Sequence, residues 1–285
     1  MTDSEGQRRG LVASNLSYAG LGNRMRFTLS ALSLAEAHGR EFCFAWPQTD
    51  AFRPPLSRLW NFREVEIDSG SADRLAQTHP YAARVEDLGE SPHELPLWIF
   101  RSGNALTVPP GAPTWSDRFR ALDPTAEIED RVRLLHRAHF AGDAYVGVSI
   151  RASAKSHAKT LEHSPIAWYK RRMSQILADT PGVKFFISCD VPEVQDELIR
   201  LFPTSIGQTN KGGYNSSEGV VASVVDLYLL AASNYMLVPY WSSFPHMAWE
   251  LAGRKIAMEH SVAGGSSELP TNVANVIDPL KPTIR

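Results

Sequence analysis

The sequence is poor in the features that mark disulfide-rich, membrane-spanning and nucleic-acid-binding proteins. It has only two cysteines, Cys43 and Cys189, each in an apolar run that favours a buried free thiol over a disulfide framework. Lys and Arg number 29 against 31 Asp and Glu, and this near balance argues against a nucleic-acid binder or a polybasic membrane-surface protein. The longest apolar run, 220–238, is interrupted by Asp226 and Asn234 and falls short of a membrane span of roughly 20 residues.

Several short motifs are also missing. The polar first ten residues have no apolar stretch behind a basic start, so they do not predict a secretory signal. The chain has no Gly-Lys-Ser/Thr phosphate loop and no Asp-x-Asp metal pair, which argues against a kinase-like or phosphatase enzyme. Gly20-Leu-Gly22-Asn23 lacks the third glycine of the dinucleotide fingerprint, which argues against a nicotinamide cofactor. We therefore expect a cytoplasmic protein of another enzyme class.

The apolar spacing at the start of the chain predicts a strand, a turn, a helix and a second strand. The first strand covers 11–15, the helix 24–38 and the second strand 42–46. This order is the unit from which doubly wound sheets are built. Residues 48–123 are rich in Pro, Trp and Arg, and we interpret them as loops and small helices of an acceptor-side domain.

The second half of the chain alternates strands and helices. After a helix near 126–138, the predicted elements are strand 145–150, helix 165–178, strand 183–188, helix 191–201, helix 220–232, strand 235–239, helix 243–253 and strand 255–258. This alternation predicts a parallel sheet that binds ligands at the carboxyl ends of its strands. Because 285 residues exceed the usual size of one core, we expect an α/β protein with domains at 1–138 and 139–285.

Four segments follow an apolar run and precede a helix, where a doubly wound sheet presents its strand ends. They are 20–24, 148–151, 187–190 and 238–244. A diphosphate suits such positions, because glycines let the backbone approach, helix N-termini present amide groups, and a fixed cation neutralises the charge.

The first of these segments has two readings. For Gly20 and Gly22 alone, a tight strand-to-helix turn is as good an interpretation as a ligand role. The presence of Asn23 and Arg24 at the helix start favours a ligand role.

Arg151 is the strongest candidate for binding an anion. It follows four β-forming residues, so it is held at the exit of a strand, and its planar fork suits two-pronged contact with phosphate oxygens. The alternative is a structural salt bridge. Ser242 and Ser243 precede an apolar helix and fit both helix N-caps and donors to phosphate.

Other polar residues, most of them outside these four segments, are further candidates. Glu162, His163 or His157, in the loop after Arg151, is a candidate base toward an acceptor hydroxyl. Asp190 serves either as a helix N-cap or as a ligand contact. Asp226 lies in an otherwise apolar helix, so it must face a cavity or a partner, and we favour a ligand.

Taken together, these motifs resemble the superfamily of α1,2-, α1,6- and protein O-fucosyltransferases, most closely the bacterial nodulation-type α1,6-fucosyltransferases. The resemblance covers both ends of the predicted sheet system, and it rests on the order and spacing of the motifs. The matching segments are Gly20-Leu-Gly-Asn23-Arg24, Val148-Ser-Ile-Arg151, Glu162-His-Ser-Pro165, Phe185-Phe-Ile-Ser-Cys-Asp190, Val225-Asp226-Leu-Tyr-Leu-Leu and Ser242-Ser-Phe244.

The resemblance implies a GT-B-like fold, with two Rossmann-like domains facing across a cleft and the nucleotide sugar bound by the second. It implies inverting transfer from a GDP-sugar to a glycan or natural-product hydroxyl, without a metal and without a separate cofactor. In residue terms it implies the following roles: Arg151 clamps the β-phosphate, Asp226 contacts guanine, Asp190 contacts ribose or orders a loop, Asn23 lies near the sugar or diphosphate, and Ser242, Ser243 and Phe244 form a phosphate-side element.

The chain departs from the superfamily pattern at two places. Ser149 replaces a histidine two residues before the arginine, and Ala152-Ser153-Ala154 replaces the usual Arg-Gly-Asp or Arg-Thr-Asp. Because that histidine helps to seat the guanine and the sugar in relatives, base and sugar identity stay open at this point. The departures also leave open a nucleotide-binding or regulatory protein with weakened catalysis.

Overall fold

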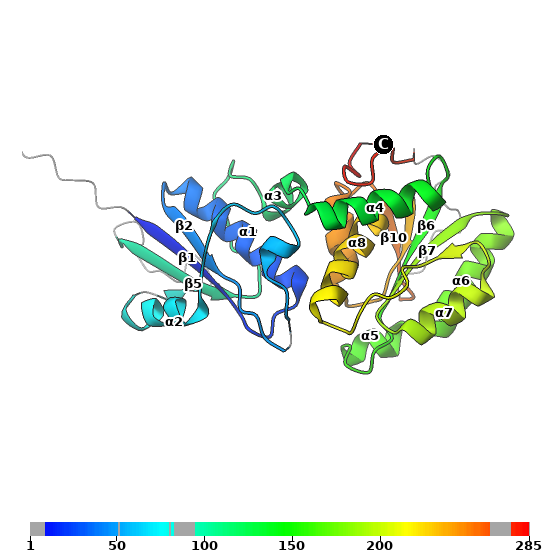
Figure 1. The fold of residues 1–285 in the computed structure, drawn as a ribbon, viewed down its shortest axis with the longest axis horizontal. Coiled ribbons are helices and arrows are strands. Elements are labelled where there is room, and N and C mark those ends of the chain that lie inside the picture. The colour runs from blue at the N-terminus through cyan, green and yellow to red at the C-terminus, as the bar shows by residue number, and fades with distance from the viewer. Residues whose placement is uncertain (1–8, 51, 80, 83–94, 263–274, 285) are drawn as a thin grey trace, which may run out of the picture. The chain divides into compact units, whose positions relative to one another are not determined.

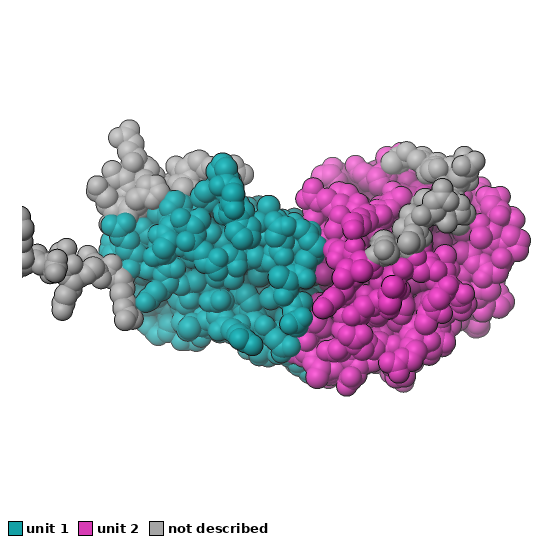
Figure 2. Space-filling view, turned by 90° about the horizontal axis from the view of Figure 1, so that it is seen from above, with its two compact units in different colours: residues 1–123 teal, residues 124–285 magenta. Residues whose placement is uncertain are grey.

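The computed structural model describes residues 9–50, 52–79, 81–82, 95–262 and 275–284. Most of the segment on which the secretory-signal prediction rests lies outside the described residues. The chain divides into two compact units, 1–123 and 124–285, shown in teal and magenta in Figure 2.

The first unit is built on a five-stranded parallel sheet with the strand order β3-β2-β1-β5-β4. Figure 1 labels its three central strands, β2, β1 and β5. Its strands are β1 (Gly10–Asn15), β2 (Glu41–Ala45), β3 (Val65–Ile67), β4 (Tyr81–Ala82) and β5 (Leu97–Ser102). Its helices are α1 (Leu21–Ala37), the 3-10 helix η1 (Leu56–Arg58), α2 (Ser69–Thr78) and α3 (Trp115–Ala121). The sheet is buried at its centre, where Val12 and Ile99 lie side by side on β1 and β5.

The predicted strand, turn, helix and strand at the start of the chain are confirmed, with one shift. Helix α1 begins at Leu21, so Gly22 and Asn23 belong to its first turn. The shift arises because Gly20 is extended and accepts the first helical hydrogen bond, from the amide of Arg24 at 3.1 Å. The turn itself is therefore short and ends at Gly20.

The prediction that 48–123 holds only loops and small helices was wrong. This segment contributes β3, β4 and β5, and β5 pairs with β1 in the middle of the sheet. The strand contains the apolar run Leu97-Trp-Ile-Phe100, in which Trp98, Ile99 and Phe100 are fully buried. The Pro and Arg residues around this short run obscure its period, and pairing with β1 decides its conformation.

The second unit is built on another five-stranded parallel sheet, with the order β10-β9-β6-β7-β8. Its strands are β6 (Tyr145–Ile150), β7 (Lys184–Cys189), β8 (Ser205–Ile206), β9 (Tyr235–Leu237) and β10 (Ala257–Glu259). Its helices are α4 (Ala126–His139), α5 (Ala158–His163), α6 (Ile166–Asp179), α7 (Pro192–Leu201), α8 (Ser217–Ala231) and α9 (Ser243–Leu251). The predicted alternation is confirmed, and only β8 and α5 had no counterpart in the prediction.

Helix α4 packs against α8 and so belongs to the second unit. The sequence-based boundary at 138 assigned this helix to the first domain, whereas the compact units divide after Asp123. The physical reason is the apolar face of α4: Ile128 and Val132 are completely buried.

In each sheet the strand order reverses beside the strand that comes first in the sequence, β1 in the first unit and β6 in the second. In the second unit the chain runs from β6 to β7 and β8 on one side, and β9 and β10 lie on the other. In the first unit β2 and β3 lie on one side of β1, and β5 and β4 on the other. Open α/β sheets bind ligands at such reversals, outside the carboxyl ends of the strands. These points lie between β6 and β9, and between β1 and β5.

Candidate functional site

Arg151 lies at the reversal point of the second sheet. It follows the last residue of β6, and its side chain is 28% exposed. Its Nη1 lies 3.4 Å from Oδ2 of Asp190, and its Cζ lies 5.5 Å from the centre of the Phe244 ring, which follows β9. Among the described residues, this long contact with Asp190 is the only hydrogen bond of the guanidinium, which has five N–H donors. The Arg151 side chain can therefore bind an anion without breaking a strong internal pair.

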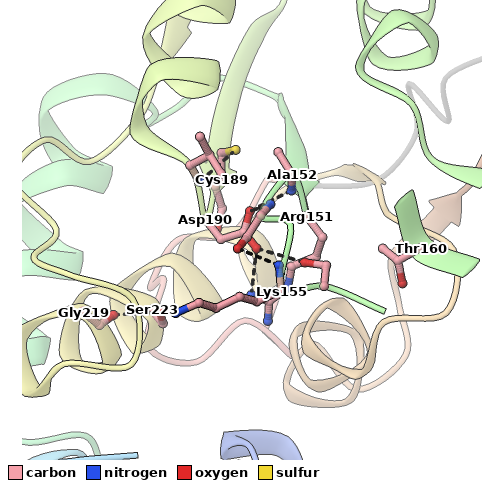
Figure 3. A network of polar contacts seen from close by, with 12 residues as sticks. Arg151, Ala152, Lys155, Thr160, Cys189, Asp190, Gly219 and Ser223 are labelled. Carbon is pink, nitrogen blue, oxygen red and sulfur yellow. Dashed lines mark hydrogen bonds and ion pairs between the residues drawn. The ribbon is translucent and has the colours of Figure 1, made fainter. Parts of the chain in front are cut away.

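Asp190 holds the backbone that follows Arg151. Its Oδ1 accepts hydrogen bonds from the amides of Ala152 at 2.7 Å and Ser153 at 3.2 Å (Figure 3). Its Oδ2 accepts longer contacts, at 3.4 Å each, from Ser156 Oγ and from Arg151. The shorter bonds are to the backbone, so Asp190 is mainly an anchor for the loop. The N-cap alternative was wrong, because Val191 is the N-cap of α7.

The loop after β9 places polar groups beside Arg151. Ser242 is the N-cap residue of α9 and makes no side-chain capping bond, and Ser243 is the first residue of the helix. Among the described residues, the hydroxyls of Ser242 and Ser243 have no hydrogen-bond partner. Free hydroxyls and amides at a helix N-terminus are suited to an anion, as is the nearby guanidinium.

Asp226 is a buried member of a polar network inside the second unit. It lies on α8, is 2% exposed, and accepts hydrogen bonds from Ser188 Oγ at 2.7 Å and from Gln208 Nε2 at 2.5 Å. Lys211 Nζ lies 3.1 Å from the same carboxylate and also donates to the carbonyl of Cys189 at 2.9 Å. The sequence required Asp226 to face either a cavity or a partner, and in the structure it faces partner side chains of the same unit. The network ties the loop after β8 to the carboxyl end of β7.

The sequence did not single out Gln208, Lys211 and Ser188, although they complete this network. The signal available was their position: Gln208 and Lys211 lie in the glycine-containing loop before α8, and Ser188 lies two residues before Asp190. Ser149 pairs with Ser188 in the parallel register and is buried in β6 at 2% exposure. Its side chain is therefore on the same face of the sheet as Ser188.

Glu162 and His163 end the short helix α5, beside the loop that follows β9. Glu162 Oε2 lies 3.9 Å from His163 Nε2, and both side chains are exposed, at 72% and 41%. The His163 ring contacts the Tyr240 ring edge-on at 5.3 Å between centres. His157 is the N-cap of the same helix, with Nδ1 accepting from the amide of Lys159. Both histidines contact the loop after β9, His163 through Tyr240 and His157 through Trp241, and both are open to solvent, as a proton acceptor for a bound hydroxyl must be.

In the first unit, Gly20 and Asn23 lie at the reversal point between β1 and β5. Gly20 has ordinary extended angles, and a methyl group added there would meet no atom within 4 Å. Asn23 is half-buried, and its Cβ lies 3.8 Å from the position that a methyl group on Gly103, just after β5, would occupy. Gly20 therefore borders open space, whereas Gly22 is buried within the first turn of α1.

Arg24 is an interior residue of the first unit. Its guanidinium donates to the carbonyls of Ala19 at 2.7 Å, Pro47 at 2.7 Å and Ser17 at 2.9 Å. It also lies 4.5 Å from the centre of the Phe52 ring, and burial lowers its pKa to about 10. The side chain is completely buried, so it holds the turn before α1 in place and does not present a cation to solvent.

No group of three or more His, Cys, Asp or Glu residues that could hold a metal ion occurs in the part of the chain that the structure describes. Within the same residues, no helix is both long and apolar enough to cross a membrane.

Two doubly wound parallel sheets, one in each compact unit, give this chain an α/β architecture of the GT-B type. No protein-family model and no curated protein matches the sequence. Solved structures match in fold. NodZ α-1,6-fucosyltransferase soaked with GDP-fucose has a TM-score of 0.60 at 21% identity, over 86% of this chain and 93% of NodZ.

Two further solved structures extend the similarity beyond the bacterial enzyme. A variant of Arabidopsis thaliana FUT1 in complex with GDP has a TM-score of 0.58 at 14% identity, over 96% of this chain and 74% of FUT1. POFUT1 in complex with GDP-fucose has a TM-score of 0.55 at 13% identity, over 89% of this chain and 98% of POFUT1. The chain therefore has the fold of the fucosyltransferases that the sequence motifs resemble.

Proposed function

We propose that the chain is a glycosyltransferase that moves a sugar, fucose or a related hexose, from a GDP-sugar to a hydroxyl of a glycan or small molecule. The transfer inverts the anomeric centre and uses no metal ion. The observation that carries the proposal is Arg151, a partly exposed guanidinium at the reversal point with one long internal contact. The similarity in fold to proteins solved with GDP-fucose or GDP supports a GDP-linked donor.

Arg151 stabilises the leaving group in this mechanism. The acceptor oxygen forms a bond to the anomeric carbon while the bond from that carbon to the β-phosphate oxygen breaks, and GDP leaves with the electron pair. Negative charge grows on the diphosphate as this bond breaks, so a guanidinium already in place lowers the energy of the transition state more than that of the bound donor.

The loop after β9 completes the diphosphate site. The N-terminal amides of α9 and the hydroxyls of Ser242 and Ser243 donate to phosphate oxygens, while Phe244 limits the movement of the Arg151 guanidinium. His163, with Glu162 beside it, accepts the proton of the acceptor hydroxyl. Asp226 acts through the loop that carries Gln208 and Lys211, which borders the carboxyl end of β7.

The experiment is a calorimetric measurement of GDP binding to the wild type and to Arg151→Ala. A hydrogen bond to a charged group contributes ~1.5–3 kcal/mol, so we expect the dissociation constant to rise roughly 10- to 150-fold. Arg171→Ala is the matched control, because Arg171 is an exposed arginine on α6 of the same unit. Equal GDP binding by the wild type and Arg151→Ala removes the central assignment.

A second candidate function is a nucleotide-binding or regulatory protein with weakened catalysis. The burial of Ser149, at the position where relatives have a histidine, favours it, because a buried hydroxyl in β6 is a poor substitute for that side chain. Consumption of GDP-fucose, monitored as release of GDP, separates the two functions. The same assay with EDTA tests whether the reaction needs a metal ion. Binding of GDP without consumption of any GDP-sugar over a panel of acceptors supports the regulatory function.

We also propose a cytoplasmic location. Cys43 and Cys189 are both free thiols, and burial raises the pKa of the Cys189 thiol to about 11, which protects it from oxidation. Reduced cysteines are the rule in the cytoplasm.

A further inference from the structure

Trp241, in the loop between β9 and α9, is an exposed aromatic residue in a strained backbone conformation. It is 57% exposed and has a φ of +60°, a left-handed conformation that bulky residues rarely adopt. Neither property serves folding, because the indole gains little burial and the backbone pays a cost of order 1–3 kcal/mol. Such positions cluster at ligand-binding sites.

The segment around α5 holds the backbone at Tyr240 and Trp241 and flanks the indole. Thr160 Oγ1 donates to the carbonyl of Trp241 at 3.2 Å, and Ser164 Oγ accepts from the amide of Tyr240 at 2.8 Å. Lys159 Nζ lies 4.5 Å from the centre of the Trp241 ring, and the His157 ring centre lies 6.2 Å away. The exposed indole is therefore flanked by a cation and by a titratable ring.

We propose that Trp241 and Lys159 form the acceptor subsite and that the acceptor is a sugar with an anionic group, a carboxylate or a phosphate. This inference rests on the proposed function. One face of a pyranose carries C–H groups that pack on the face of the indole opposite Lys159. The Lys159 side chain is long and exposed, so its ammonium moves to the edge of the indole to meet an anionic substituent of that sugar.

The position of Trp241 suits an acceptor next to the donor diphosphate. Phe244, which contacts the Arg151 guanidinium, follows Trp241 by three residues, a distance of at most ~11 Å even in a fully extended chain. Tyr240 joins the indole to the base candidate, with ring centres 6.0 Å from Trp241 and 5.3 Å from His163. A sugar on Trp241 therefore lies near both the proposed base and the site of the leaving group.

The acidic group on the same helix as Lys159 does not prevent an anion from binding. Glu162 is on α5, three residues after Lys159, and its carboxylate lies 3.9 Å from His163 Nε2. It is 72% exposed, so solvent screens its charge. A nucleobase also stacks on an indole, but its ring carries no anionic group for Lys159 to recognise.

The test is saturation-transfer NMR with methyl β-D-glucuronide and methyl β-D-glucoside, in the presence of saturating GDP, followed by titration. We expect the wild type to bind the glucuronide roughly fivefold more tightly than the glucoside, the ratio that one exposed ion pair supports. Lys159→Gln removes this preference, and Trp241→Ala weakens both sugars at least about tenfold, while Trp241→Phe retains both. Lys281→Gln, an exposed lysine of the same unit, is the control.

The affinity for GDP separates this inference from the proposed function. We expect Trp241→Ala and Lys159→Gln to bind GDP within twofold of the wild type. Three results overturn the acceptor subsite. The wild type binds neither sugar, or the preference for the glucuronide survives Lys159→Gln. The third is a loss of GDP affinity in Trp241→Ala, which shows that the indole stacks on the guanine. A wild type that binds the glucuronide as expected but does not bind GDP leaves the sugar site in place and removes the proposed function.

Discussion

The two carboxylate oxygens of Asp190 have different partners, so its role in holding the loop can be tested separately from its role as a counter-charge. Oδ1 accepts both backbone amides of the loop after Arg151, whereas Oδ2 faces the Arg151 guanidinium and Ser156. Asp190→Asn keeps a carbonyl oxygen for the amides and removes the charge. Asp190→Ala removes both, so the two variants distinguish loop order from charge pairing.

The magnitudes follow from the distances and the exposure. Two backbone hydrogen bonds to a buried carboxylate contribute ~1.5–3 kcal/mol each, so we expect Asp190→Ala to lose ~3 kcal/mol or more of unfolding free energy. In Asp190→Asn the same two bonds go to a neutral oxygen and contribute ~0.5–1.5 kcal/mol each, so we expect roughly half the loss of Asp190→Ala. The contact with Arg151 is long and partly exposed and adds at most about 1 kcal/mol. Urea denaturation measures both values.

We expect GDP affinity to depend on the order of the loop after Arg151 and not on the charge of Asp190. We expect Asp190→Ala to bind GDP roughly tenfold more weakly, because the backbone that carries Arg151 is no longer held. Asp190→Asn should bind GDP at least as tightly as the wild type, because the guanidinium has lost its internal counter-charge. If the two variants have the same stability and the same GDP affinity, Asp190 does not act through Oδ1 and the reasoning is refuted.

Two further predictions test the first unit and the core of the second. Gly20→Ser should leave the stability unchanged, because serine is a good N-cap and the site has room, but should raise the KM for the GDP-sugar roughly tenfold if a ligand approaches this backbone; an unchanged KM refutes a binding role. Gly219→Ala is the contrasting control, since its methyl group would lie 2.2 Å from the Gly213 carbonyl and should prevent proper folding. Glu259→Gln should cost ~3–5 kcal/mol in urea denaturation, because Glu259 accepts two bonds from the buried Arg172 guanidinium; a loss below about 1 kcal/mol contradicts the importance of this pair.

The strands and helices of the second unit were readable from the sequence because strand and helix patterns alternate along it. Strands β6 and β7 have four apolar residues each and stand between helical patterns, and the largely apolar 15-residue helix α8 is long enough to define an element. Strand β5 has a comparable role in the first sheet and also has four apolar residues, but its flanks are rich in Pro and Arg, which obscures the alternation of strands and helices there. Its assignment depends on pairing with β1, which is distant in sequence.

The candidate site was readable only in part. The position of Arg151 after an apolar strand predicted its exposure at a strand end, since local order decides where a strand stops. The fates of Arg24 and Asp226 were not readable, because each depends on partners that come from other segments. Arg24 is satisfied by carbonyls that precede α1 and follow β2, and Asp226 by side chains from β7 and from the loop after β8.

Local chemistry in the chain was enough to establish the α/β class, the alternation of strands and helices, and the segments in which polar groups follow strands, because these depend on neighbours within a few residues. Folding in three dimensions was needed to decide the strand order, the side of β6 on which β9 lies, and which charged side chains are consumed inside the protein. The reason is that strand pairing and the burial of a charge join residues far apart in sequence, and their free energies depend on distances that no local pattern records.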